Sequence, residues 1–206
     1  MKHSLFMAHP WHGISPELNK EGSVISFIEI LPQDQIKYEI DKVSGFLKVD
    51  RPQKFSNVVP YPYGFIPQTY SGRRVAELSE KRGLQVNKGD GDPIDVLVIS
   101  DRPILRSALI IRIQLIGGLA ISDNHEADDK LIGIVSQDAN YFGWKDITDL
   151  PESITKRLEH YFSTYKYWDD LNKSKLITSR WYSKGEAIDV IEKGMEDYRE
   201  KFCNDL

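Results

Sequence analysis

Residues 24–51 read VISFIEILPQDQIKYEIDKVSGFLKVDR, and this stretch decides the fold class. It holds three runs rich in β-branched and aromatic residues, which lie at 24–30, 36–40 and 46–51. Such runs with short turn-like connections predict an antiparallel meander, and therefore a small barrel or sandwich. Polar and apolar residues alternate in the second run, so Lys37 and Glu39 are expected on one face of their strand.

Further along the chain, the pattern changes from strands to helices. More β-type runs follow at 96–100, 107–116 and 131–135. Beyond them, apolar residues recur at helical spacing in two segments. The first holds Ile154, Leu158, Tyr161 and Tyr165, and the second holds Ile188, Ile191, Met195, Tyr198 and Phe202. The sequence therefore predicts an α+β chain that is mainly β, with two C-terminal helices.

Two segments depart from this pattern. Residues 1–22 are predicted to form an irregular N-terminal arm, in which His9 and His12 are either metal ligands or surface histidines. Residues 71–89 are largely polar and charged, which is typical of a surface excursion between two strands. This excursion has room for one helical turn and is the best candidate for an insertion into a single domain of residues 1–206.

The composition excludes several classes of protein. The 206 residues suggest one domain, and 40% hydrophobic with 11% aromatic residues suffice for a core. The formal net charge of −4 disfavours nucleic-acid binding. Cys203 is the only cysteine, which excludes a disulfide framework and fits a reducing cytoplasm. The apolar runs are too short for a membrane span, and the start of the chain lacks the pattern of a signal peptide.

Three carboxylates are concentrated in residues 89–95, Gly-Asp-Gly-Asp-Pro-Ile-Asp, just before an apolar run. Asp, Gly and Pro are poor strand formers, so Asp90, Asp92 and Asp95 are expected in a loop that enters a strand. Like charges this close repel one another, and raised pKa values or a bound cation relieve the repulsion. Oxygen ligands favour hard cations such as Mg²⁺, Mn²⁺ or Ca²⁺.

Taken alone, the aspartate loop has other interpretations. One is a solvated acidic turn. Another is a calcium loop, because Asp101 is the twelfth position counted from Asp90. Ile94 and Asp95, however, replace the ligand at the fifth position and the glycine at the sixth. A second acidic loop, residues 122–130, also enters a strand, and in a barrel-like fold two such loops can converge at one mouth.

A series of short motifs then supports an enzyme. They are FIEI (27–30), IKYEID (36–41), VDR (49–51), YGFI (63–66), DGDPID (90–95), Asp123 with Asp128 and Lys130, and finally Tyr165-Lys166. With these motifs in this order, the chain resembles the family I soluble inorganic pyrophosphatases over most of residues 24–166. The resemblance implies hydrolysis of pyrophosphate to two phosphates with several Mg²⁺ ions. It also implies a compact five-stranded OB-like β-barrel flanked by helices, and a homo-oligomer.

The same resemblance implies a role for each matched side chain. Asp92 would orient and deprotonate the attacking water. The metal ligands would be Glu29, Asp90, Asp95, Asp123 and Asp128. The groups that bind or support the phosphates would be Lys37, Glu39, Arg51, Tyr63, Lys130, Tyr165 and Lys166. Such a mixture suits pyrophosphate, because a compact, highly charged anion needs cations on every side and a metal-activated water as nucleophile.

Two positions depart from the bacterial pattern of the family, and other functions compete with it. Val59 stands where an aromatic residue is frequent, and Asn124 where an acid is frequent. The competing enzyme is a metal-dependent hydrolase of another phosphoanhydride, although the chain has no glycine-rich nucleotide loop. The competing functions of other classes are an OB-like nucleic-acid-binding module and calcium buffering.

Overall fold

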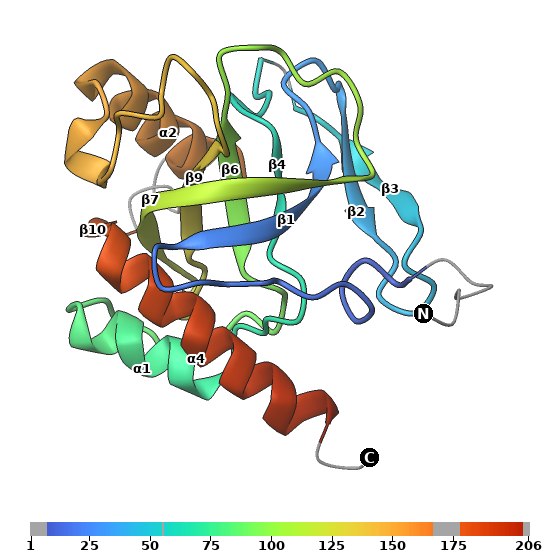
Figure 1. Ribbon diagram of the computed structural model, residues 1–206. Coiled ribbons are helices and arrows are strands. Elements are labelled where there is room, and N and C mark those ends of the chain that lie inside the picture. Colours follow the sequence, from blue (N-terminus) through green and yellow to red (C-terminus); the bar gives the residue numbers. More distant parts are fainter. Residues whose placement is uncertain (1–7, 55, 167–177, 204–206) are drawn as a thin grey trace.

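The computed structural model describes residues 8–54, 56–166 and 178–203, and its centre is a five-stranded barrel (Figure 1). The strands are β1 (Ser23–Ile30), β4 (Tyr63–Phe65), β6 (Asp95–Ile99), β9 (Lys130–Val135) and β7 (Leu109–Asp123). Each pairs with the next in this order, and β7 pairs with β1 to complete the ring. Only β6 and β9 run parallel among these pairs. The predicted OB-like, mainly β fold is confirmed.

The barrel wall is apolar on both faces because helices cover its outside. On β6, Val96 and Val98 belong to the core cluster that packs on the C-terminal helix, whereas Leu97 and Ile99 belong to a second cluster. β7 is 15 residues long and shifts register beyond Leu115. There Gly118 allows the Tyr182 ring to approach, since a Cβ at this position would lie 2.3 Å from the ring.

The hairpin of β2 (Ile36–Ile40) and β3 (Leu47–Pro52) stands beside the barrel as a separate two-stranded sheet. Its antiparallel pairing is as predicted. The three-stranded meander is wrong, because among the described strands β1 pairs with β4 and β7 instead of β2. The reason is polarity. β1 is almost wholly buried in the ring, whereas β3 exposes Lys48, Val49 and Asp50.

The two predicted C-terminal helices are α2 (Glu152–Thr164) and α4 (Lys184–Phe202). Strand β10 (Thr178–Ser183) leads into α4 and pairs with β7, and a short 3-10 turn, η1 (Ile147–Asp149), precedes α2. At the start of α4, the Ser183 hydroxyl accepts from the Glu186 N–H and the Glu186 carboxylate accepts from the Ser183 N–H, which is a capping box. None of the described helices is long and apolar enough to cross a membrane.

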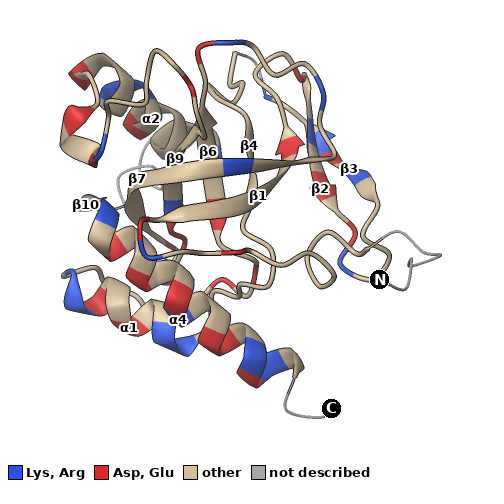
Figure 2. Ribbon diagram, in the orientation of Figure 1, with Lys and Arg blue, Asp and Glu red and all other residues tan. Residues whose placement is uncertain are grey.

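Segment 71–89 contains a third helix, α1 (Arg73–Lys81), where the sequence predicted one turn. Val75, Ala76 and Ser79 are buried, and α1 lies beside α4 (Figure 1). Charges of both signs cover the two helices elsewhere (Figure 2). With only these three residues buried, the apolar face of α1 is narrow, and its periodic pattern in the sequence is too weak to predict the whole helix. At its end, β5 (Lys88–Gly89) pairs with β8 (Glu126–Ala127), so this segment reaches the second acidic loop.

Candidate active site

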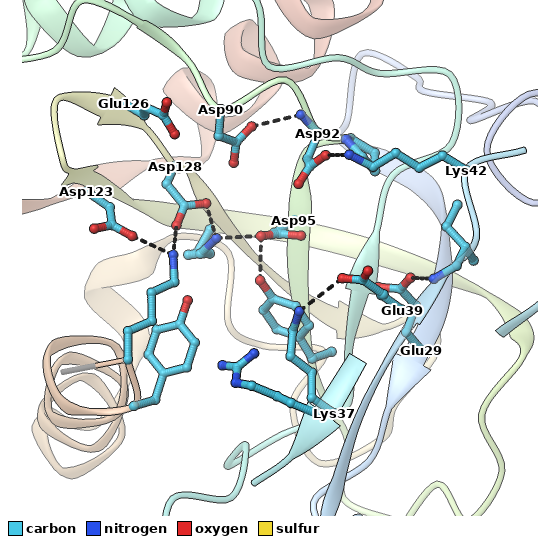
Figure 3. A pocket seen from close by; sticks show the side chains of 17 residues that line it. Glu29, Lys37, Glu39, Lys42, Asp90, Asp92, Asp95, Asp123, Glu126 and Asp128 are labelled. Atoms are coloured by element: carbon cyan, nitrogen blue, oxygen red, sulfur yellow. Dashed lines mark hydrogen bonds and ion pairs between the residues drawn. The ribbon is translucent and has the colours of Figure 1, made fainter. Parts of the chain in front are cut away.

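A single pocket at the barrel mouth gathers every residue that the sequence assigned to a site (Figure 3). It encloses about 270 Å³, which is just below the range of about 300–1,000 Å³ typical of pockets for organic ligands. The barrel, the β2–β3 hairpin and the end of α2 all contribute. Its lining residues are Glu29, Lys37, Glu39, Ile40, Lys42, Arg51, Tyr63, Asp90, Asp92, Pro93, Asp95, Asp123, Glu126, Asp128, Lys130, Tyr165 and Lys166.

Lys130, the first residue of β9, lies at the centre of the pocket and is 1% exposed. Its ammonium donates to the carboxylates of Asp95 and Asp128, which come from different loops. Asp95 also accepts from the Tyr63 hydroxyl. Burial alone would lower the pKa of Lys130, but Asp128 and Asp95 outweigh it and raise that pKa well above its usual value. Lys130 is therefore a permanent cation between the two acidic loops.

The surroundings of the carboxyl groups near Lys130 shift their pKa values in opposite directions. Burial, followed by repulsion from Asp128, raises the pKa of Asp90 well above its usual value. Burial also raises the pKa of Asp95, against the attraction of Lys130. The pKa of Asp128 is instead lowered to about 2, because Lys130 and Lys166 outweigh the effect of burial. A pocket with this many close acids has a strong need for further positive charge.

Glu29 approaches the same pocket from β1 and is 7% exposed. Burial raises its pKa to about 8, although its Oε1 accepts from the Ile40 N–H at 2.7 Å. The Asp95 carboxylate adds a smaller repulsion to the same shift. Its position in the almost wholly buried strand β1 brings a buried carboxyl to the wall of the pocket.

The outer part of the aspartate loop is more accessible to solvent. Asp90 accepts from the Asp92 N–H at 3.0 Å, which folds the loop back on itself. The Asp92 side chain is 48% exposed and pairs with the Lys42 ammonium, which extends from the turn between β2 and β3 (Figure 3). The Asp92 side chain is thus more accessible than that of Asp95, which is 21% exposed.

The phosphate-binding candidates line the sides of the pocket. Lys37 bonds to Glu39 at 3.2 Å and to Asp50 at 2.7 Å, and these two acids raise its pKa against the effect of burial. Arg51 bonds to Asp50 at 2.8 Å. On the opposite side, Lys166 pairs with Asp123 and lies 3.6 Å from Asp128.

Two charged residues of the pocket were not predicted from the sequence. Lys42 follows the IKYEID motif directly, and Glu126 lies in the second acidic loop. Singly, each has the appearance of a surface charge in a turn. Glu126 also bonds to Lys88 at 2.8 Å, so the end of segment 71–89 contacts a residue that lines the pocket.

The two departures from the bacterial pattern have structural explanations. Asn124 occupies a left-handed turn with φ of 51°, a conformation that Asn tolerates better than most residues. Its side chain bonds to the Asp123 carboxylate at 3.1 Å. Val59 is buried in the core cluster beneath α2, at 1% exposure.

The donor set of the pocket fits divalent cations. Carboxylate oxygens from two loops and from Glu29 line the same pocket, where burial, with a smaller contribution from neighbouring acids, raises the pKa values of Asp90, Asp95 and Glu29. Within the described ranges, no three acidic, histidine or cysteine side chains already converge on one point. Ammonium groups lie between the acids instead, so metal ligation requires small side-chain movements here.

The fold and pocket together define a barrel enzyme for a small, multiply charged anion with divalent ions. A family model described as inorganic pyrophosphatase matches residues 26–199. Inorganic pyrophosphatases of Chlamydia caviae and Chlamydia muridarum are 40% and 41% identical to this chain. The alignments cover 99% and 98% of this chain, and 97% and 98% of those proteins.

The structural comparison agrees. A crystal structure of an inorganic pyrophosphatase from Neisseria gonorrhoeae matches with a TM-score of 0.75 at 27% identity, covering 90% of this chain and 96% of that one. The chain belongs to the inorganic pyrophosphatase family, and it is an enzyme.

Proposed function

We propose that this enzyme hydrolyses inorganic pyrophosphate to two phosphates with several Mg²⁺ ions, in the pocket around Lys130. The hydrolysis of pyrophosphate and a requirement for divalent metal follow from family membership. The choice of Mg²⁺ and the role of each side chain belong to the proposal. Its main support is that the buried ammonium of Lys130 lies between carboxylates of both acidic loops in one small pocket.

Five acids would hold the metal ions. Asp90, Asp95 and Asp128 would bind the tightest one, with Asp95 also reaching a second. Glu29, Asp123 and Asp128 would serve the ions that arrive with the substrate. When bound, Mg²⁺ neutralises phosphate oxygens and lowers the pKa of a water ligand. The support from this chain is that these acids approach the pocket from β1 and from both acidic loops.

Asp92 would act as the general base that orients the attacking water and accepts its proton. Its greater exposure supports this role, because a base needs direct access to water. The cations Lys37, Arg51, Lys130 and Lys166 would bind phosphate oxygens, with the hydroxyls of Tyr63 and Tyr165 as donors. Glu39 would support them, because its carboxylate holds Lys37 at 3.2 Å and Lys48 at 3.3 Å. Burial and the Asp95 charge raise the pKa of Tyr63 well above its usual value, which keeps it a donor.

Further properties are proposed on the family resemblance and the composition. The chain would form a single domain and a homo-oligomer, with phosphate as its released product. The lone Cys203 is consistent with a reducing cytoplasm. Light scattering coupled to size-exclusion chromatography measures the oligomeric state, and a monomer at assay concentrations would contradict this part of the proposal.

Removal of metal is the first test. Excess EDTA is expected to abolish phosphate release from pyrophosphate, and added Mg²⁺ to restore it, because carboxylate oxygens prefer hard ions. Ca²⁺ should substitute poorly, since it is larger and less strict in geometry. ATP in place of pyrophosphate should yield far less phosphate. Full activity in EDTA would refute the metal requirement, and faster turnover of ATP would favour another phosphohydrolase.

Substitution of Arg51 tests the phosphate-binding assignment. Arg51→Lys is expected to raise the KM for pyrophosphate several-fold, because an ammonium cannot replace the two-pronged guanidinium donor. Arg102→Lys is a matched control, since Arg102 also pairs with the preceding aspartate but is 92% exposed at its side chain. Steady-state kinetics measures both variants. Equal KM values for the two variants would show that Arg51 does not bind the substrate.

A further inference from the structure

Residues 69–71 lie beneath the aspartate loop and hold it by three hydrogen bonds. The Thr69 hydroxyl accepts from the Ile94 N–H at 2.9 Å. The Ser71 N–H donates to the Asp92 carbonyl at 2.7 Å, and the Ser71 carbonyl accepts from the Gly91 N–H at 3.1 Å. The backbone of the loop is therefore fixed at Gly91, Asp92 and Ile94, between its acidic side chains.

Ser71 also reaches the second acidic loop. Its hydroxyl donates to the Ala127 carbonyl at 3.0 Å, and Ala127 directly precedes Asp128. Ser71 is 3% exposed, so water has little access to take over this bond. One buried residue thus binds the main chain of both loops that carry the proposed metal ligands.

The surroundings of Ser71 are built for this close contact. A Cβ at Gly89 would lie 2.1 Å from the Ser71 carbonyl oxygen, so a larger residue there would push the loop away. From the other side, the Tyr70 N–H donates to the Gly194 carbonyl of α4 at 3.0 Å. The Trp11 indole N–H donates to the Thr69 carbonyl at 2.8 Å. Residues 69–71 are therefore anchored to α4 and to the N-terminal arm.

We propose that Ser71 is a positioning residue, which sets the separation of the two acidic loops and thereby the metal affinity of the pocket. The inference rests on the proposed function for the assignment of Asp90, Asp95 and Asp128 as ligands. A metal ion that takes oxygens from both loops binds well only if their spacing is held before it arrives. The hydroxyl of Ser71 joins residues 69–71, which hold the aspartate loop, to the main chain of the second loop.

The test compares Ser71→Ala with Ser26→Ala. Ser26 is a matched control, because it is also buried and its hydroxyl donates to a distant backbone carbonyl, that of Ile111, at 3.1 Å. Calorimetric titration with Mg²⁺ alone, without pyrophosphate, gives the dissociation constant of the metal. We expect this constant to rise about tenfold in Ser71→Ala, because losing a group that supports the metal ligands typically weakens metal affinity by at least that much. In Ser26→Ala the constant should stay unchanged.

Two further measurements separate positioning from a general loss of stability. Urea unfolding should show similar midpoint shifts for the two variants, since each loses one buried hydroxyl bond. The kcat of Ser71→Ala should return to that of the unsubstituted enzyme at saturating Mg²⁺. Ser71→Cys keeps a donor at the same position, although a weaker one on a larger atom, and should give a smaller rise in the same constant.

The outcomes distinguish the inference from the proposed function. Equal Mg²⁺ dissociation constants for Ser71→Ala and Ser26→Ala, or a kcat deficit that persists at saturating Mg²⁺, would overturn the role of Ser71 and leave the proposed function intact. If instead Asp95→Asn binds Mg²⁺ as tightly as the unsubstituted enzyme, the ligand assignment fails and the inference fails with it.

Discussion

Asp92→Asn is expected to lower kcat for pyrophosphate by about 10²- to 10⁴-fold, the usual contribution of a general base. The substitution removes the carboxylate that would accept the proton of the attacking water and leaves the shape of the loop intact. The Asp92 N–H bond to Asp90 and the Asp92 carbonyl bond to Ser71 are made by the main chain, so both persist. Higher Mg²⁺ should restore little of the activity, because a base cannot be replaced by more metal.

Asp95→Asn is the matched comparison, since it removes the same charge from the same loop. Asp95 is only partly exposed, with 21% of its side chain accessible, and bonds to Lys130 and Tyr63; under the proposal it would bind metal. Its substitution should chiefly weaken metal binding, so rising Mg²⁺ should restore part of the rate. The measurement is kcat of both variants across a Mg²⁺ titration. Rescue of Asp92→Asn without rescue of Asp95→Asn would reverse the two roles.

Lys130→Met is expected to destabilise the fold by about 3–5 kcal/mol, the usual cost of removing one partner of a buried ion pair. Met preserves most of the volume of the side chain. Without the ammonium, the carboxylates of Asp95 and Asp128 would face each other in a buried site. Added Mg²⁺ should stabilise the variant more than the unsubstituted protein, because the ion supplies the charge that was lost.

Urea unfolding with and without Mg²⁺ measures this effect. Lys156→Met is the control, since Lys156 pairs with Glu152 on the exposed face of α2 with 69% of its side chain accessible. Its free energy of unfolding should change by no more than about 0.5 kcal/mol, as for most surface substitutions. A similar small change for Lys130→Met would show that the central ion pairs contribute nothing to the fold.

Much of the site could be predicted from the sequence because its residues lie in short local patterns. Alternation along β2 puts Lys37 and Glu39 on one face, whereas Asp128 and Lys130 are brought together where the second acidic loop enters β9. The apolar runs between turns predicted a barrel or a sandwich, and the resemblance to the pyrophosphatase family implied the five-stranded barrel.

The missed features depend on contacts between distant segments. The pairing of β1 with β7 instead of β2 follows from burial on both faces, which a local run of letters does not reveal. Helix α1 has few apolar positions and gains its stability from α4, where Asp197 accepts from the N–H of Arg74 at 3.0 Å. Lys42 becomes a pocket residue only because the hairpin turn faces the aspartate loop.

The proposed function requires that the acids of the two loops hold the catalytic metal ions around the position of Lys130. Anomalous diffraction from crystals soaked with Mn²⁺, a hard ion with similar ligand preferences, tests it most directly. We expect an anomalous peak within coordination distance of Asp90, Asp95 and Asp128, with the Lys130 ammonium withdrawn from the carboxylates of Asp95 and Asp128. Peaks confined to other parts of the molecule, at a Mn²⁺ concentration that supports activity, would contradict it.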